Sequence, residues 1–533
     1  MKIKANYIEP IGENERSNSA LGGALSLTLS AILVKLLGLL YKIPLANILG
    51  EEGMGYFNSA YTVYGLFYLL CTAGVPKAVT MLIVKAKEGR GVFTCEKIMK
   101  TAIAAFFGLS AVITLLFVLL SDPISSFIGN SRAKTTMIAV APSIIFVSLA
   151  GVIRGYMTAE MKLLSVSISQ IVESAGKLVF GLIFARRAAE IGLPPEMISA
   201  FTILGVSIGS ALGFLYLAFA SKFSFLCKKS GQSFENSSKL NILKEIFKIS
   251  LPITVSAAVM SITNIIDLTV TMRALIRIGY SAEEATALYG NYTTLAVPMF
   301  NLAVSLITPI SVAYLPVFVK SSIASDREKE GQSLKSALSF SAFLSAPIFI
   351  GIIVFSKEIL ALIFGNMGIS IGAPLLCLLM PSFAFMSILL IVNSKLESVG
   401  DLKAPIISMI IGSALKMLVG GFFLSNSDFG ISGAPIGTVI CYAAALITSL
   451  IIAEKKHSIS FPIFTTHVIP YLNSALSVLI GRIVYNKILL TFSSNAALII
   501  TIGVCALIYA IMSVLSGAMS VKKIKKLAKY TKV

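Results

Sequence analysis

The sequence predicts an all-α, polytopic membrane protein with about fourteen transmembrane helices, arranged as two six-helix lobes plus two C-terminal helices. Of its 533 residues, 56% are hydrophobic and only 13% are charged. Apolar stretches of 18 or more residues recur from end to end. This composition excludes a soluble globular protein, because such stretches are long enough to cross a bilayer as helices.

The predicted spans follow from hydropathy alone, with ends uncertain by a few residues. They lie near residues 22–47, 56–75, 99–120, 135–153, 165–185, 199–219, 251–272, 292–316, 336–355, 372–393, 405–424, 434–453, 468–485 and 496–516.

The distribution of Lys and Arg predicts that both termini are cytoplasmic in a cell membrane. The loops and tails on that side carry 30 Lys and Arg, against 9 on the outer side. The N-terminal arm lacks a basic region and a cleavage site, so we expect no removed signal peptide. The basic C-terminal tail favours contact with anionic membrane lipids over nucleic acid. It contains Lys522, Lys523, Lys525, Lys526, Lys529 and Lys532.

The sequence shows no machinery for covalent chemistry. Its six cysteines are scattered without CxxC spacing, which indicates neither a disulfide framework nor a metal site. His457 and His467 are the only histidines, and no metal-binding, phosphate-binding or nucleophile motif is present. We therefore expect a transporter without metal or cofactor, and no enzyme.

An internal repeat predicts the lobes. The segment Ser174–Phe184 aligns without a gap on Ser413–Phe423, with five of eleven positions identical, including Lys177 and Lys416. A weaker echo pairs the glycine turns at Gly50 and Gly279. These matches relate spans one to six and seven to twelve. The expected domains are an N-lobe (1–220), a cytoplasmic linker (221–250), a C-lobe (251–455) and a C-terminal part with spans thirteen and fourteen (456–533).

Two lysines in the first span indicate an anion site. Lys35 and Lys42 lie seven residues apart, nearly two helical turns, so both point the same way. A lysine near the centre of a membrane helix costs about 2.5–3.5 kcal/mol, which a structural role rarely justifies. The alternative, snorkelling to an interface, suits Lys42, just before Pro44, better than Lys35.

Charged residues also fall inside spans five, seven and eleven. Glu173 and Lys177 lie one turn apart in span five, and Asp267 and Lys416 lie in spans seven and eleven. These residues are expected either to form ion pairs that let polar faces pack, or to couple a cation to transport.

Three further residues are candidates for substrate binding. Tyr61 belongs to a tyrosine stripe in span two, which suits either packing or sugar stacking. Arg154 and Arg273 end spans four and seven and would line the two mouths of a cavity, or serve as interfacial anchors. Cations exceed acids among these residues, which favours an anionic substrate.

The sequence resembles the multidrug, oligosaccharidyl-lipid and polysaccharide exporter superfamily, and within it the stage V sporulation protein B-like and MurJ-like lipid II flippases. The resemblance covers nearly the whole chain. Besides the repeat, it depends on the segments 31–46, 50–57 and 73–79. The resemblance implies alternating access between two lobes of a monomeric carrier. Its substrate would be a polyprenyl-diphosphate-linked saccharide, whose lipid tail spans thirteen and fourteen would receive.

By the same resemblance, Lys35 and Lys42 match cationic positions of the family's first helix, and Arg273 is the counterpart across the cavity. One departure stands out. Some flippases place sodium among acidic and amide groups of spans seven, eleven and twelve, where this chain has Lys416 and only Asp267 as an acid. The alternatives to a flippase are a cation-coupled multidrug antiporter, which needs more acids, and a membrane glycosyltransferase or polymerase, which needs a large outer loop.

Overall fold

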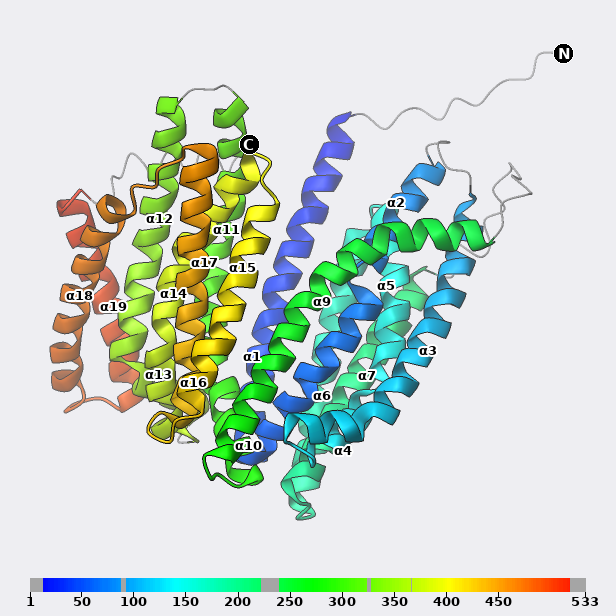
Figure 1. Ribbon diagram of the computed structural model, residues 1–533, viewed down its shortest axis with the longest axis horizontal. Helices are drawn as coiled ribbons and strands as arrows, with labels where there is room; N and C mark the ends of the chain where they lie inside the picture. The colour runs from blue at the N-terminus through cyan, green and yellow to red at the C-terminus, as the bar shows by residue number, and fades with distance from the viewer. Residues whose placement is uncertain (1–12, 88–92, 222–238, 324–326, 366, 518–533) are drawn as a thin grey trace. The chain divides into compact units, whose positions relative to one another are not determined.

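The computed structural model describes residues 13–87, 93–221, 239–323, 327–365 and 367–517. Within these ranges some side chains of α1 and α9, including that of Lys35, and those of Ile323 and Arg327 lie outside the description. Every regular element of the described residues is a helix, as Figure 1 shows. The chain divides into two compact units, Met1–Leu268 and Thr269–Val533, with the boundary inside one helix, α9.

Unit 1 is built around the paired helices α6 and α7, against which α1, α4 and α5 pack. The short helix α2 lies on α5 and α3. Its helices are α1 (Glu13–Thr72), α2 (Val75–Lys87), α3 (Cys95–Ile128), α4 (Ala133–Val140), α5 (Ser143–Ala159), α6 (Leu163–Glu190), α7 (Pro195–Ser221) and most of α9 (Lys239–Arg277).

Unit 2 is built around α14 and α17, and α18 and α19 pack together, with α18 against α12. Two π-helical turns, η1 and η2, interrupt its long helices. The elements are α10 (Ala282–Asn291), η1 (Tyr292–Ala296), α11 (Val297–Ile323), α12 (Arg327–Val354), α13 (Ser356–Phe364), α14 (Ile369–Ser398), α15 (Lys403–Leu415), η2 (Lys416–Gly420), α16 (Gly421–Leu424), η3 (Gly430–Ser432), α17 (Gly433–His457), α18 (Ile463–Ile488) and α19 (Ser494–Leu515).

The all-helical membrane fold predicted from hydropathy is confirmed. Within the described residues, twelve helical stretches are long and apolar enough to cross a membrane. All fourteen predicted segments are largely helical, although the second crosses the break between α1 and α2 and the fourth crosses the break between α4 and α5. The first predicted span and most of the second lie in α1, on either side of its break at Gly50. The seventh lies in α9, and some side chains of α9 are not described. The count of fourteen therefore stays a prediction.

The break in α1 occurs at Gly50, whose φ of 67° and ψ of −176° suit glycine alone. Gly279, its predicted repeat counterpart, also has a positive φ, 108°, and ends the turn after α9. In unit 2 the next helix begins with a capping box between Ser281 and Glu284. Both units thus turn at a glycine with a positive φ.

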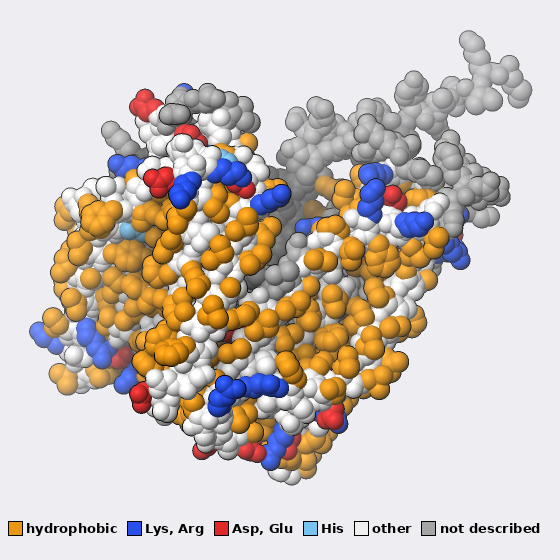
Figure 2. Space-filling model, viewed as in Figure 1, with side chains coloured by type: hydrophobic (Ala, Val, Ile, Leu, Met, Phe, Trp, Pro, Cys, Tyr) orange, Lys and Arg blue, Asp and Glu red, His pale blue; other side chains and the backbone are white. Residues whose placement is uncertain are grey.

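The surface of the units is apolar where lipid is expected. Large hydrophobic side chains such as Leu119 of α3 and Leu507 of α19 are 64% and 67% exposed. On the face shown in Figure 2, hydrophobic side chains cover the sides of both units, and charged ones gather toward the helix ends. This distribution is that of a multi-pass membrane protein.

The predicted linker is described only in its last part, since residues 222–238 lie outside the described residues. From Lys239 onward this part is already helical and continuous with the predicted seventh span. Its Ile242 and Ile246 are buried in the core of unit 1. A Cβ at Gly74 would lie 2.3 Å from the Ser250 carbonyl oxygen, so glycine permits this close approach. The N-terminal arm to residue 12 and the basic tail also lie outside the described residues.

Candidate functional site

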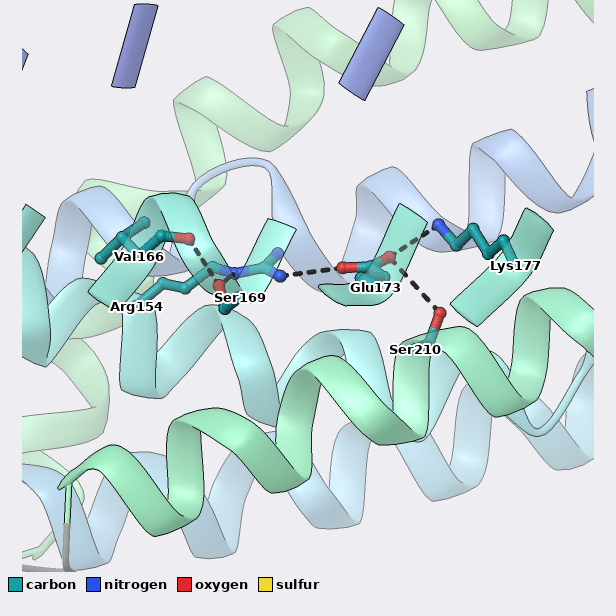
Figure 3. A network of polar contacts seen from close by, with 6 residues as sticks. All are labelled: Arg154, Val166, Ser169, Glu173, Lys177 and Ser210. Atoms are coloured by element: carbon teal, nitrogen blue, oxygen red, sulfur yellow. Dashed lines mark hydrogen bonds and ion pairs between the residues drawn. The ribbon is translucent and has the colours of Figure 1, made fainter. Parts of the chain in front are cut away.

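Glu173 is the centre of a polar network inside unit 1 (Figure 3). Its carboxylate accepts hydrogen bonds from Arg154 Nη2 at 2.8 Å and Lys177 Nζ at 2.7 Å. Arg154 Nε also donates to Ser169 Oγ at 3.1 Å, and Ser210 Oγ donates to Glu173 at 3.4 Å. Two cations thus share one anion, which leaves the network with one net positive charge.

Helical spacing brings these groups together. Ser169, Glu173 and Lys177 follow one another every four residues along α6, so they lie on one face. Arg154 comes from α5 and Ser210 from α7. The Glu173 side chain is only 9% exposed, against 13% for Arg154 and 24% for Lys177. Lys177 is therefore the most exposed side chain of the network.

Glycines let α6 and α7 approach closely enough to enclose the network. A Cβ at Gly209 would lie 2.5 Å from the Glu173 carbonyl oxygen and 2.6 Å from the Lys177 backbone nitrogen. A Cβ at Gly205 would lie 2.4 Å from the Gly181 nitrogen. The spacing of Gly205 and Gly209 is the GxxxG pattern typical of tightly packed membrane helices.

A ladder of aromatic rings on α1 approaches the same network. Phe57, Tyr61, Tyr64 and Tyr68 succeed one another with ring centroids 5.6–6.0 Å apart. Tyr41 of the same helix covers Gly181, one turn from Lys177 on α6, and its ring packs edge-on against Phe57 with centroids 6.2 Å apart. Tyr64 is 3% exposed and Tyr61 is 43% exposed. Tyr64 is therefore packed, whereas Tyr61 is accessible, and whether Tyr61 stacks on a sugar stays a prediction.

Lys42 lies on α1 and is partly buried. Among residues whose side chains the structure describes, none pairs with its ammonium group by a hydrogen bond or an ion pair. Tyr41, the preceding residue, packs against the face of α6 at Gly181. Lys35 lies on the same helix, but its side chain lies outside the described set. Arg273 belongs to unit 2 and is exposed.

When the alignment of Ser174 with Ser413 is extended along both units, unit 2 shows a counterpart of this network. Ser408 takes the place of Ser169, and Asn393 that of Arg154. Ser449 Oγ lies within hydrogen-bond distance of both, 2.8 Å from Ser408 Oγ and 3.0 Å from Asn393 Oδ1. The two units thus keep the same polar positions with different charges, which supports the internal repeat.

The counterpart of Glu173 in unit 2 is Gly412, where a Cβ would lie 2.5 Å from the Cys441 carbonyl oxygen. No carboxylate side chain fits there. Lys416 begins the π-helical turn η2 and packs on Gly437, as Lys177 packs on Gly209. Asp267 belongs to unit 1 and Lys416 to unit 2, so the expected pair between them stays a prediction.

Two ion pairs between helices of unit 2 were not predicted. Lys395 of α14 is fully buried and donates to Glu330 of α12 and to Ser322 of α11, the latter at 2.8 Å. Glu358 of α13 accepts from Arg482 of α18 at 2.5 Å. In the sequence Lys395 looks like an ordinary loop-flanking lysine, and no local signal distinguishes it. Both pairs connect helices of unit 2 to each other, which is typical of ion pairs that stabilise a fold.

The chemistry available is binding and release. Within the described residues, no group of three His, Cys, Asp or Glu side chains could hold a metal ion. The accessible polar groups are ammonium and hydroxyl donors beside aromatic rings, which suit an anion or a polyhydroxylated ligand.

Comparison with solved structures identifies the fold. The inward closed conformation of the lipid II flippase MurJ matches with a TM-score of 0.67 and 19% identity, over 92% of this chain and 98% of that one. An inward-facing multidrug resistance MATE family transporter of the MOP superfamily matches with a TM-score of 0.63 and 16% identity, over 82% and 98%. The chain therefore shares the fold of these two proteins, in agreement with the predicted all-helical membrane architecture.

The family follows from the sequence comparison. A family described as polysaccharide biosynthesis protein matches residues 20–322, more than half of the chain, and the chain belongs to that family. Relatives from Bacillus subtilis (strain 168) include the lipid II flippase MurJ, 22% identical over 87% of this chain and 88% of its own length. Stage V sporulation protein B is 21% identical over 82% of each chain. Among these neighbours MurJ is a flippase and the MATE family protein is a transporter, and neither is an enzyme, in agreement with the prediction.

Proposed function

We propose that this protein is a flippase for a polyprenyl-diphosphate-linked saccharide, either lipid II or a related cell-envelope glycan precursor. It moves the substrate from the inner to the outer leaflet by alternating access. Family membership and the flippase among its relatives support the class of substrate.

The observation that carries the proposal is the Lys42 ammonium. It lies in a membrane-spanning stretch and has no anionic partner among the described side chains. A charge of this kind is costly unless a ligand compensates it, and a diphosphate accepts several charge-assisted hydrogen bonds. Lys35 is proposed to contact the same diphosphate, and Arg273 of unit 2 is proposed to bind the substrate as well.

Arg154 has a different proposed role from Lys42. Its guanidinium group is occupied by Glu173 and Ser169, so any contact with substrate would be shared with these partners. We propose that it keeps Lys177 and Glu173 in place, and that the net positive charge of the network attracts the diphosphate. For Asp267 and Lys416 we propose that the lysine supplies the positive charge that a bound metal cation would otherwise bring.

Movement of charge would drive the cycle. With the cell interior negative, each negative charge moving outward through 100 mV gains about 2.3 kcal/mol, and the same field favours inward return of an empty cationic site. The potential therefore favours export of an anionic substrate.

The test is complementation of a bacterial strain depleted of its lipid II flippase. The wild-type chain and Lys42→Arg should restore growth, whereas Lys42→Ala should fail at equal membrane levels. Lys85→Ala, which removes an exposed lysine of α2, is the matched control and should restore growth. Normal complementation by Lys42→Ala would contradict the proposal. Failure of the wild-type chain together with conferred drug efflux would favour the multidrug antiporter instead.

A further inference from the structure

Tyr61 presents one aromatic ring from a ladder that is otherwise largely covered. Its side chain is 43% exposed, whereas Phe57 beneath it is 3% exposed and Tyr64 beside it is 3% exposed. The Tyr61 and Phe57 rings are stacked, 8° from parallel with centroids 6.0 Å apart. The Tyr64 ring also packs against Tyr61, with the two ring centroids 5.6 Å apart. The orientation of the exposed ring is therefore fixed before any ligand arrives.

The charged network lies next to this ring. Tyr41 covers Gly181, one turn from Lys177 on α6, and its ring packs edge-on at 6.2 Å against Phe57, the ring on which Tyr61 stacks. The Lys177 side chain is 24% exposed. An ammonium has three donor hydrogens, and one of them serves Glu173 at 2.7 Å. Hydrogen-bond donors therefore remain for a ligand that lies on the Tyr61 ring.

This combination distinguishes Tyr61 from the other tyrosines of the stripe. A ring that only packs would be buried, as Tyr64 is. A ring that only anchors the helix at the membrane interface does not need a charged network beside it. A flat apolar surface with donors at its edge fits a pyranose ring, which has an apolar face of C–H groups and hydroxyl groups around its rim.

We propose that Phe57 and Tyr61 form a stacking platform for one pyranose ring of the substrate, and that Lys177 donates to a hydroxyl or carboxylate oxygen of that sugar. This inference rests on the proposed function and deepens it. The diphosphate and the sugar are then recognised by different residues of unit 1, Lys42 for the first and Tyr61 with Lys177 for the second.

The chain contains no tryptophan, so a single substitution makes the platform report on its own occupancy. Tyr61→Trp keeps a large aromatic surface and gives the protein one source of indole emission. The purified full-length variant is titrated with chitobiose, a soluble disaccharide without diphosphate or lipid. We expect a saturable change in emission. Tyr280→Trp, at a tyrosine of unit 2 that is 38% exposed, is the matched control and should not respond.

Adding Lys177→Gln to Tyr61→Trp should weaken chitobiose binding about 10–150-fold, the usual effect of losing one charge-assisted hydrogen bond. In the complementation assay, Tyr61→Trp and Tyr61→Phe should support growth and Tyr61→Leu should not. A chitobiose titration that leaves Tyr61→Trp unchanged, or normal growth with Tyr61→Leu, would overturn the platform. Either result would leave the flippase standing if the wild-type chain complements, whereas failure of the wild-type chain counts against the flippase itself.

Discussion

Replacing Glu173 by Gln should destabilise unit 1 more than any comparable surface change. The substitution keeps the shape of the side chain but removes the one negative charge shared by Arg154 and Lys177, at 2.8 Å and 2.7 Å. Breaking a buried pair in this way typically costs about 3–5 kcal/mol, because the partner charges stay buried without compensation. All three side chains are less than a quarter exposed, so solvent screens their charges only weakly.

This loss of free energy of unfolding can be expressed as a decrease in the melting temperature, Tm. At about 2.1 cal/mol/K of unfolding entropy per residue, a loss of about 3–5 kcal/mol lowers Tm by about 3–5 °C if the whole chain unfolds together. The shift is about twice as large if unit 1 unfolds alone. The assay is thermal unfolding of the purified protein in detergent, followed by the remaining monodisperse fraction.

The matched control is Glu190→Gln. Glu190 also pairs with two arginines, Arg186 and Arg187, but its side chain is 47% exposed and both distances are 3.3 Å. Exposed pairs contribute about 0–1 kcal/mol, so this control should change Tm little. Adding Lys177→Met to Glu173→Gln should recover part of the loss. Equal shifts for Glu173→Gln and Glu190→Gln would refute the reasoning.

Three further predictions concern other parts of the chain. Gly209→Ala should lower the free energy of unfolding by about 1–3 kcal/mol, because its Cβ would meet backbone atoms of α6 at 2.5 Å. Gly108→Ala on α3 has open space around the new Cβ and should not destabilise the protein in the same unfolding assay. Asp267→Asn and Lys416→Met should each lower folded membrane yield and the double variant should recover much of it; additive losses would show that they are not partners. Hydrogen bonds from His457 and Lys456 lower the pKa of Asp401 from 3.8 to about 2. The charged carboxylate therefore stabilises the folded protein above pH 4, and this stabilisation is lost as the pH falls through 2. Asp401→Asn should reduce Tm at pH 7 and cease to matter near pH 2.

Hydropathy predicted the helices of this chain well because a membrane span needs only a long apolar segment. It could not predict where a helix breaks: Gly50 interrupts α1 through backbone conformation, which leaves no mark on hydropathy. The π-helical turn at Lys416 is likewise a local change in hydrogen bonding, set by packing on α17 rather than by composition.

The candidate site was predicted in part. The i, i+4 spacing of Glu173 and Lys177 is a local signal, and the pair is present. The third member, Arg154, lies nineteen residues earlier on another helix, and its contact depends on how α5 packs. Lys395 and Glu330 are 65 residues apart in the chain, so only the tertiary fold shows that they form a buried pair.

The central claim is that Lys42 binds the diphosphate of a lipid-linked saccharide during translocation. The most direct test reconstitutes the purified chain in liposomes with a fluorescent polyprenyl-diphosphate saccharide and measures its appearance in the opposite leaflet. Losing one charge-assisted contact of about 1.5–3 kcal/mol should slow transfer by Lys42→Ala about 10–150-fold relative to wild type and to Lys85→Ala. Transfer by Lys42→Ala at the wild-type rate, or no transfer by the wild-type chain above protein-free liposomes, would contradict the account.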